Sequence, residues 1–283
     1  ANDLQQTADG GYVLVGSTFN GTDDDVWVVK YTPTLSLSWQ DTIKGAFNDV
    51  GNSIQQTLDG SYVVCGTSHD GNDEDIVLWK IAADGLSHTA LYTETTDNGT
   101  RDFGNYAQQT YDGGYIIVGK SQTTTNAEDI RLIKLDATNA SDGTVALSIG
   151  FDSTYAVADG VYNDDGIFVQ QTQDNGYAIV GNYWASGYGQ NNLFVLKTDS
   201  QGADATKSIS TFGGGFNDFG NCVRETDDGG FIIIGSKLSQ TATNEDVWVL
   251  KLTYDLSTEW EKTYGGDFDD VGSSINQTTD GGY

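Results

Sequence analysis

The sequence TADGGY at residues 7–12 returns five more times along the chain, as TLDGSY (57–62), TYDGGY (110–115), TQDNGY (172–177), TDDGGF (226–231) and TTDGGY (278–283). Successive copies end 50, 53, 62, 54 and 52 residues apart. A period near fifty residues indicates one supersecondary unit that is copied in tandem. A residue shared by every copy is therefore expected to belong to the scaffold. A residue that departs from the pattern is the better candidate for function.

Two short apolar segments accompany each of the first five copies of the motif, the first of them starting at the last residue of the motif. The first segments are YVLVG (12–16), YVVCG (62–66), YIIVG (115–119), YAIVG (177–181) and FIIIG (231–235). The second are VWVVK (26–30), IVLWK (76–80), IRLIK (130–134), LFVLK (193–197) and VWVLK (247–251). Apolar residues at nearly every position predict strands that are buried on both faces. With one strand before and one after them, the units are expected to be four-stranded antiparallel blades, which makes the chain an all-β protein of the β-propeller class.

On this interpretation the chain is a single propeller with five complete repeats and the start of a sixth. The complete repeats span about 1–49, 50–102, 103–164, 165–218 and 219–270, and the partial repeat spans 271–283. A sixth first strand without its partners would leave an unpaired strand edge. We therefore expect either that the native protein is longer, which we favour, or that neighbouring chains complete the blade by self-assembly.

The segments "QQTADGGYVLVGST", "DDDVWVVKY" and "STEWEKTYGG" resemble the QTxDGGYxxxGxT…DxWxxKL…GxxxW…TYGG repeats of secreted and cell-surface proteins from bacteria and archaea. The resemblance covers essentially the whole chain. It implies a propeller and an extracellular or cell-surface location, and it implies no activity. The turn itself also resembles the WD-type blade turn and the Asp-box of sialidases.

The composition is strongly acidic, with 41 Asp and Glu residues against 13 Lys and Arg and a formal net charge of −28. Such a surface repels nucleic acid and anionic lipid, so we expect neither as a partner. No apolar run reaches the roughly 20 residues of a membrane helix, so membrane insertion is not expected. Cys65 and Cys222 belong to different repeats and are expected to be buried small residues, with a disulfide the less favoured alternative.

The acidic residues raise the question of calcium. The segment DGNDED (70–75) places Asp70, Asp73 and Asp75 in one loop, and hard cations prefer several oxygen ligands. These three residues are the candidate metal ligands, and calcium is the cofactor that they would suit. In the alternative interpretation, each loop carboxylate caps a backbone amide or pairs with the Lys that ends the second apolar segment. No loop has the twelve-residue calcium pattern with its closing Glu.

One loop departs from the acidic pattern. Where the other repeats carry Asp and Glu, the fourth reads NYWASGYGQNN (182–192). Tyr183, Trp184 and Tyr188 are the candidate ligand-binding residues, because flat aromatic rings beside amides suit sugar stacking or a protein contact. In the alternative interpretation, the rings pack against a neighbouring blade. The preceding repeat is also long, and we expect its extra residues at 136–165 to form loops near this surface.

Signals for catalysis are weak, and no catalytic residues are predicted. His69 and His88 are the only histidines, which gives little support to a zinc site or a His-based triad. The first functional hypothesis is therefore a binding or structural interaction module with a protein or carbohydrate partner. The alternative is a carbohydrate-active propeller enzyme, a hydrolase or lyase, that uses residues of the first strands and the 182–192 loop.

Overall fold

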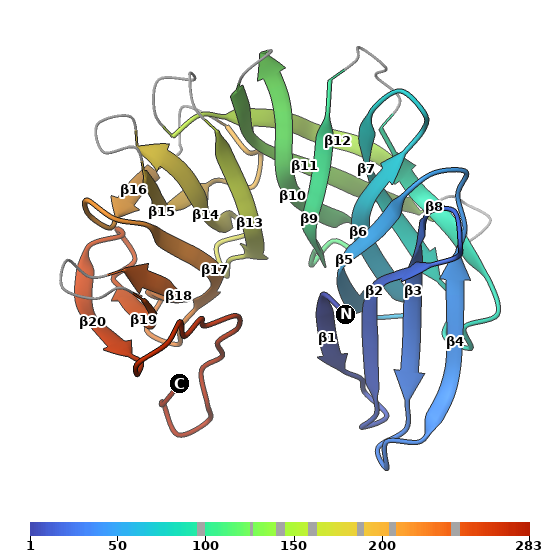
Figure 1. The fold of residues 1–283 in the computed structure, drawn as a ribbon, viewed down its shortest axis with the longest axis horizontal. Coiled ribbons are helices and arrows are strands. Elements are labelled where there is room, and N and C mark those ends of the chain that lie inside the picture. Colours follow the sequence, from blue (N-terminus) through green and yellow to red (C-terminus); the bar gives the residue numbers. More distant parts are fainter. Residues whose placement is uncertain are drawn as a thin grey trace. The chain divides into compact units, whose positions relative to one another are not determined.

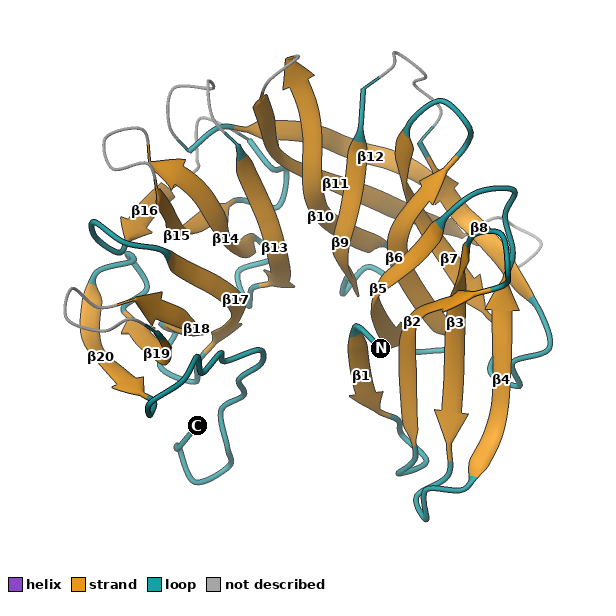
Figure 2. Ribbon diagram, in the orientation of Figure 1, coloured by secondary structure: helices purple, strands orange, loops and turns teal. Residues whose placement is uncertain are grey.

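The computed structural model describes residues 1–283 except 95–99, 125–126, 140–144, 158–162, 186–189, 204–207 and 239–243. The described residues form twenty β-strands in five four-stranded antiparallel sheets, and none of them is helical (Figures 1 and 2). Each sheet is one blade of the predicted β-propeller and corresponds to one sequence repeat. The chain divides into two compact units, residues 1–122 with 133–150 and residues 123–132 with 151–283.

Within each blade the strands follow the order of the chain, so each pairs with the next. The first blade contains β1 (Asp3–Gln6), β2 (Tyr12–Phe19), β3 (Asp24–Tyr31) and β4 (Leu37–Ile43). The second contains β5 (Asp49–Gln56), β6 (Tyr62–His69), β7 (Glu74–Ile81) and β8 (His88–Thr93). The third contains β9 (Asp102–Gln109), β10 (Tyr115–Thr124), β11 (Ala127–Asn139) and β12 (Val145–Tyr155). The fourth contains β13 (Asp164–Gln171), β14 (Tyr177–Ala185), β15 (Gln190–Thr198) and β16 (Ser208–Phe212). The fifth contains β17 (Asp218–Glu225), β18 (Phe231–Leu238), β19 (Glu245–Leu252) and β20 (Thr258–Tyr264).

The second blade shows why its central strands are apolar at consecutive positions. Tyr62 and Val64 of β6 pack against residues of β2 and β3, whereas Val63 and Cys65 pack against residues of the third blade. Side chains alternate between the two faces of a strand, so a blade between two others buries both sets. Each fully buried Val or Ile contributes roughly 1.5–3 kcal/mol to folding. The prediction of doubly buried strands is confirmed here.

Neighbouring blades are also joined along their first strands by side-chain amides. The Oε1 of Gln5 accepts a hydrogen bond from the backbone of Gln56, and the Oε1 of Gln55 accepts one from Gln109, at 2.5 and 2.7 Å. In the second unit, Gln170 accepts from the backbone of Glu225 at 2.9 Å. The Gln residues before each motif therefore link neighbouring blades. They form hydrogen bonds between the blades, whereas the packing of apolar faces alone provides none.

Two sequence expectations about loops were wrong. Among the described residues of the long stretch at 136–165, those up to Asn139 extend β11, and Val145–Tyr155 form the eleven-residue strand β12. Their alternating apolar and polar residues favour a longer hairpin over a binding loop. In the fourth blade β14 continues to Ala185, so Tyr183 and Trp184 lie on the end of a strand. Among the described residues, no helix is long and apolar enough to cross a membrane.

Candidate functional site

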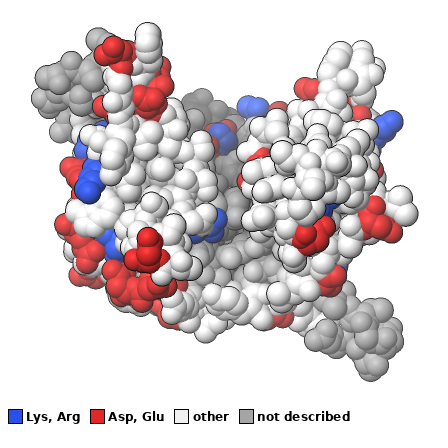
Figure 3. All heavy atoms as spheres, turned by 90° about the horizontal axis from the view of Figure 1, so that it is seen from below, with Lys and Arg blue, Asp and Glu red and all other residues white. Residues whose placement is uncertain are grey.

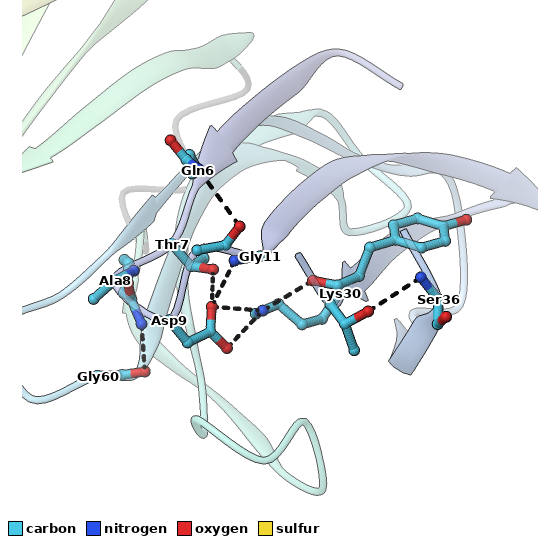
Figure 4. Close-up of polar contacts among 12 residues, drawn as sticks. Gln6, Thr7, Ala8, Asp9, Gly11, Lys30, Ser36 and Gly60 are labelled. Carbon is cyan, nitrogen blue, oxygen red and sulfur yellow. Dashed lines mark hydrogen bonds and ion pairs between the residues drawn. The ribbon is translucent and has the colours of Figure 1, made fainter. Parts of the chain in front are cut away.

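The repeated turn has the same internal contacts in the first blade as in most of the others. Asp9 accepts hydrogen bonds from the Thr7 hydroxyl at 2.5 Å and the Gly11 amide at 2.9 Å (Figure 4). The ammonium group of Lys30 contacts the same carboxylate at 3.0 Å and also donates to the Tyr31 carbonyl. The bonds from Thr7, Gly11 and Lys30 hold the pKa of Asp9 far below its usual value. The arrangement is a structural staple, as the six copies predict.

The equivalent ion pair recurs in three further blades. Lys80 contacts Asp59 at 2.5 Å, Lys134 contacts Asp112 at 2.8 Å, and Lys251 contacts Asp228 at 3.0 Å. The position after the motif's Asp also needs a left-handed backbone, with φ of +79° at Gly10 and +67° at Asn175. The turn geometry is therefore shared by the fourth blade, but the ion pair is not.

In the fourth blade, Tyr254 from the turn between β19 and β20 takes part in place of the ion pair. Its hydroxyl donates to Oδ2 of Asp174 at 2.9 Å. The Nζ of Lys197 donates to the Tyr254 carbonyl at 3.0 Å and lies 3.2 Å from the centroid of the Tyr254 ring. Asp174 keeps its bonds from the Thr172 hydroxyl and the Gly176 amide. A side chain of the fifth blade thus closes over the turn of the fourth.

Glu225 is a second residue near the turn of the fourth blade that departs from the repeat pattern. The residue before the Thr of the motif is Gln in the other five copies, at positions 6, 56, 109, 171 and 277, and Glu only at 225. The Oε2 of Glu225 accepts the backbone N–H of Gln173 at 2.8 Å, directly beside Asp174. We refer to Asp174, Lys197, Glu225 and Tyr254 as the Asp174–Glu225 cluster. All four belong to the second unit, and Asp174 and Tyr254 are exposed.

The environments of the two carboxyl groups shift their pKa values in opposite directions. Burial and the charge of Asp174 raise the pKa of Glu225, although the Gln173 amide opposes this. Burial also disfavours ionisation of Asp174, but the bonds from Thr172, Gly176 and Tyr254 outweigh it and lower its pKa. Burial lowers the pKa of Lys197. The two carboxyl groups of the cluster therefore differ in how readily each is ionised.

The predicted ligand-binding residues lie elsewhere. Trp184 is 36% exposed and Tyr183 is half-buried, whereas Tyr188 lies outside the described residues. Trp184 and Tyr177 are at opposite ends of β14, roughly 23 Å apart at the usual rise of a strand. The aromatic residues and the Asp174–Glu225 cluster therefore do not form one site. Their role in binding stays a prediction.

The predicted metal ligands do converge. Each of Asp70, Asp73 and Asp75 offers a carboxylate oxygen within 4.8 Å of the other two. Burial and the charges of Asp73 and Asp70 raise the pKa of Asp75 to about 6. In the first blade the counterpart of Asp70 is Asn20, whose amide donates to Asp23 and Asp25. Three carboxylates are fewer than the six to eight oxygens that calcium takes, so water or backbone carbonyls would have to supply the rest.

Three other features of the sequence can be placed. Cys65 and Cys222 are both buried and form no disulfide, as expected. The guanidinium of Arg224 lies 4.6 Å from the centroid of the Phe168 ring. Red carboxylates greatly outnumber blue basic groups on the face drawn in Figure 3, which agrees with the net charge of −28.

The Asp174–Glu225 cluster was not predicted from the sequence, although one of the two departures that define it can be recognised in the sequence. The replacement of Gln by Glu at 225 is a departure from the repeat and could have been found by comparing the copies. The contribution of Tyr254 could not, because it approaches Asp174 from a turn 80 residues further along the chain.

No protein-family model matches this chain, and no curated protein matches its sequence. Its fold is similar to that of the α-L-arabinofuranosidase Arb93A from Fusarium graminearum, with a TM-score of 0.61, 11% identity, and coverage of 94% of this chain and 80% of that one. A putative exo-β-1,3-galactanase from Bifidobacterium bifidum matches with a TM-score of 0.51, 14% identity, and coverage of 96% and 93%. A protein of unknown function from Dyadobacter fermentans matches with a TM-score of 0.53, 11% identity, and coverage of 93% and 82%.

At these identities the likeness establishes the β-propeller fold and nothing finer. It nevertheless corrects the first functional hypothesis, a binding or structural interaction module. Two of the matched propellers are named as carbohydrate-active enzymes, which agrees better with the alternative hypothesis.

Proposed function

We propose that this chain is a carbohydrate-active propeller enzyme, a glycoside hydrolase, whose reaction centre is the Asp174–Glu225 cluster. The observation that supports the proposal is that, among the described turns, the turn of the fourth blade differs from the contacts shared by the others. At this turn an acidic side chain replaces Gln, and a Tyr hydroxyl meets the turn carboxylate. The carbohydrate activities of two propellers of similar fold support the choice of substrate class.

Glycoside hydrolysis needs one carboxyl group that holds a proton and one that is ionised. Glu225, with its raised pKa, suits the acid that protonates the glycosidic oxygen as the bond to the anomeric carbon breaks. Asp174, with its lowered pKa, suits the base that takes a proton from the water attacking that carbon. Tyr254 holds the Asp174 carboxylate in position, and the charge of Lys197 favours its ionised form. Lys197 and Tyr254 are positioning residues in this scheme.

The cluster is open to a polymeric substrate, because Tyr254 is 56% exposed and Asp174 is exposed. An extracellular or cell-surface location, which the repeat resemblance implies, would bring the protein to such polymers. A carbohydrate is the proposed partner.

The test is a hydrolysis assay with β-1,3-galactan, arabinan and aryl α-L-arabinofuranosides, measured by the release of reducing sugar or phenol. Glu225→Gln restores the residue of the other five repeats, so the fold should be retained. We expect it to lower kcat about a hundredfold or more, since general acids contribute roughly 10²–10⁴ to rates. The rate of the wild type should fall as the pH rises through the elevated pKa of Glu225.

A matched pair of turn variants separates chemistry from stability. Asp174→Asn should abolish turnover, whereas Asp228→Asn removes the same carboxylate from the fifth blade and should leave turnover unchanged. Full activity of Glu225→Gln, or equal loss in both Asp→Asn variants, would contradict the assignment. No release of sugar from any of these substrates by the wild type would also count against it.

A further inference from the structure

A polar pocket lies where the second blade meets the third. Its volume is about 330 Å³, at the lower end of the range for small-molecule sites, so it has room for one small ring. We call it the Thr67–Phe103 pocket, and its polar and aromatic lining residues are Asn48, Asn52, Thr67, His69, Glu74 and Phe103. All six belong to the first compact unit.

The pairing of β6 with β7 explains why the polar residues share one face. His69 of β6 lies opposite Glu74 of β7, and Thr67 is two residues before His69, so the three side chains project to the same side. Cys65, two residues further back, packs against the third blade on that side. Phe103 of β9 completes the lining from the third blade.

The fifth blade shows how a hydroxyl and a carboxylate at these positions can satisfy each other. Ser236 and Glu245 stand at the repeat positions of Thr67 and Glu74. The Ser236 hydroxyl donates to Oε2 of Glu245 at 2.7 Å. In the second blade the carboxylate of Glu74 is instead bound by Arg101, with Nε to Oε2 at 2.6 Å and Nη2 to Oε1 at 3.2 Å.

The Thr67 hydroxyl is the feature that points to a ligand. Among the described residues, its Oγ1 has no hydrogen-bond partner, and the residue is only 8% exposed. A buried polar group without a partner costs folding free energy, and such groups are rare in folded proteins. Because Thr67 lines the pocket, a ligand there can bond this hydroxyl, which both donates and accepts.

The neighbouring groups add further donors and acceptors. Nδ1 of His69 accepts the N–H of Gly71 at 2.9 Å, so in the neutral ring the proton lies on Nε2, which can donate. The Nδ2 of Asn52 donates to the Gly104 carbonyl at 2.8 Å, so its Oδ1 can accept. Phe103 adds an apolar wall. Such a lining matches a sugar, which carries hydroxyl groups around a ring of C–H groups.

The charges at the pocket favour a neutral ligand. The bonds from Arg101 lower the pKa of Glu74, so the carboxylate stays ionised and paired. The guanidinium also lies 5.0 Å from the centroid of the Phe103 ring, which helps to hold the aromatic wall in place. An anion would be repelled by the net charge of −28. A cation would find one carboxylate in the lining, already bound by Arg101.

We infer that the Thr67–Phe103 pocket binds one neutral sugar residue, as a site separate from the Asp174–Glu225 cluster. The Thr67 hydroxyl and Nε2 of His69 bond sugar hydroxyls, and Phe103 packs against the C–H groups. The cluster belongs to the second compact unit. Binding in the pocket requires no hydrolysis, so the site does not depend on the proposed activity.

Free monosaccharides test the pocket, because they contain no glycosidic bond that the protein could hydrolyse. D-galactose, L-arabinose and D-glucose are titrated by calorimetry and by saturation-transfer NMR. We expect at least one of them to bind with a Kd of about 1 mM, an ordinary strength for a ligand of roughly a dozen non-hydrogen atoms.

Four variants test the geometry. Thr67→Val removes the hydroxyl but keeps the branched shape, and it should raise Kd about fivefold or more. Thr67→Ser keeps the hydroxyl and should bind as the wild type does. His69→Phe introduces the residue that the first repeat has at this position, Phe19, and should also weaken binding. Ser236→Ala removes the counterpart hydroxyl of the fifth blade and is the control, with an unchanged Kd.

Absence of binding by the wild type at about 10 mM of each sugar, ten times the expected Kd, would overturn the inference. Binding that Thr67→Val and His69→Phe leave unchanged, or that Ser236→Ala weakens equally, would overturn it as well. Thr67→Val should keep the hydrolysis rate of the wild type, so failure of the pocket and failure of the proposed activity are told apart. Thermal melting of each variant establishes that weaker binding does not result from unfolding.

Discussion

Replacement of Asp112 by Asn tests whether the repeated turn is scaffold. Asn keeps an oxygen that can accept from the Thr110 hydroxyl and the Gly114 amide, which contact Oδ1 of Asp112 at 2.5 and 3.0 Å. It loses the charge that the Lys134 ammonium contacts at 2.8 Å and places an amide donor there instead. The substitution therefore removes the ion pair while the turn itself can persist.

The size of the effect follows from burial and from the remaining partners of Lys134. The Lys134 side chain is only 5% exposed, but Asp112 is 51% exposed, so solvent screens their attraction. Lys134 also keeps Asp136 at 2.9 Å and the Leu135 carbonyl at 3.0 Å. A hydrogen bond to a charged group contributes about 1.5–3 kcal/mol. After screening, we expect the free energy of unfolding to fall by about 1–2 kcal/mol.

Scanning calorimetry measures this directly. A loss of that size lowers Tm by about 2–6 °C in a protein of this length. Leu58→Asn changes an exposed residue in the same turn of the second repeat and should leave Tm unchanged. A Tm of Asp112→Asn within about 1 °C of the wild type would refute the reasoning. So would a loss of carbohydrate hydrolysis at unchanged Tm, because it would give the scaffold residue a role in the reaction.

Three further predictions concern other parts of the chain. The Thr226 hydroxyl, the Gly230 amide and Lys251 lower the pKa of Asp228 to about 2, below its unfolded value of 3.8. Its contribution to stability is therefore complete above pH 4 and lost as the pH falls to about 2, so Tm should drop less across this range in Asp228→Asn than in the wild type. Trp184→Ala should weaken glycan binding about fivefold in a glycan-array or calorimetric titration, and unchanged binding would remove the aromatic residues from consideration. If Asp75 is a calcium ligand, Asp75→Asn should reduce calcium affinity at least about tenfold by calorimetry, and an unchanged titration would favour the alternative in which the loop carboxylates only cap amides.

The sequence predicts the blades well because their determinants are local and repeated. The consecutive apolar residues of β6 and the Asp of each turn have counterparts in the other repeats. A strand or turn that is ambiguous in one repeat can therefore be assigned from the other repeats. Strand ends are less predictable. Trp184 continues β14 because it pairs with Asn191 across the hairpin, and aromatic residues beside Gly and Ser do not indicate whether such pairing continues. The four residues of the Asp174–Glu225 cluster come from four separate turns or strand ends, so only the fold brings them together.

A repeat protein can change one turn at small cost to the whole, because stability is roughly a sum over repeats and their interfaces. Loss of the Lys–Asp pair at Lys197 affects one blade, while the equivalent pairs at Lys30, Lys80, Lys134 and Lys251 persist. Tyr254 replaces part of what was lost, because it supplies both a hydrogen bond to Asp174 and a ring over Lys197. Glu225 still accepts a backbone hydrogen bond where the other copies use Gln, so the link between the blades is retained while an ionisable group is gained. The fold therefore allows a second carboxyl group to lie beside the turn carboxylate of Asp174 while the hydrogen bonds of the turn are kept.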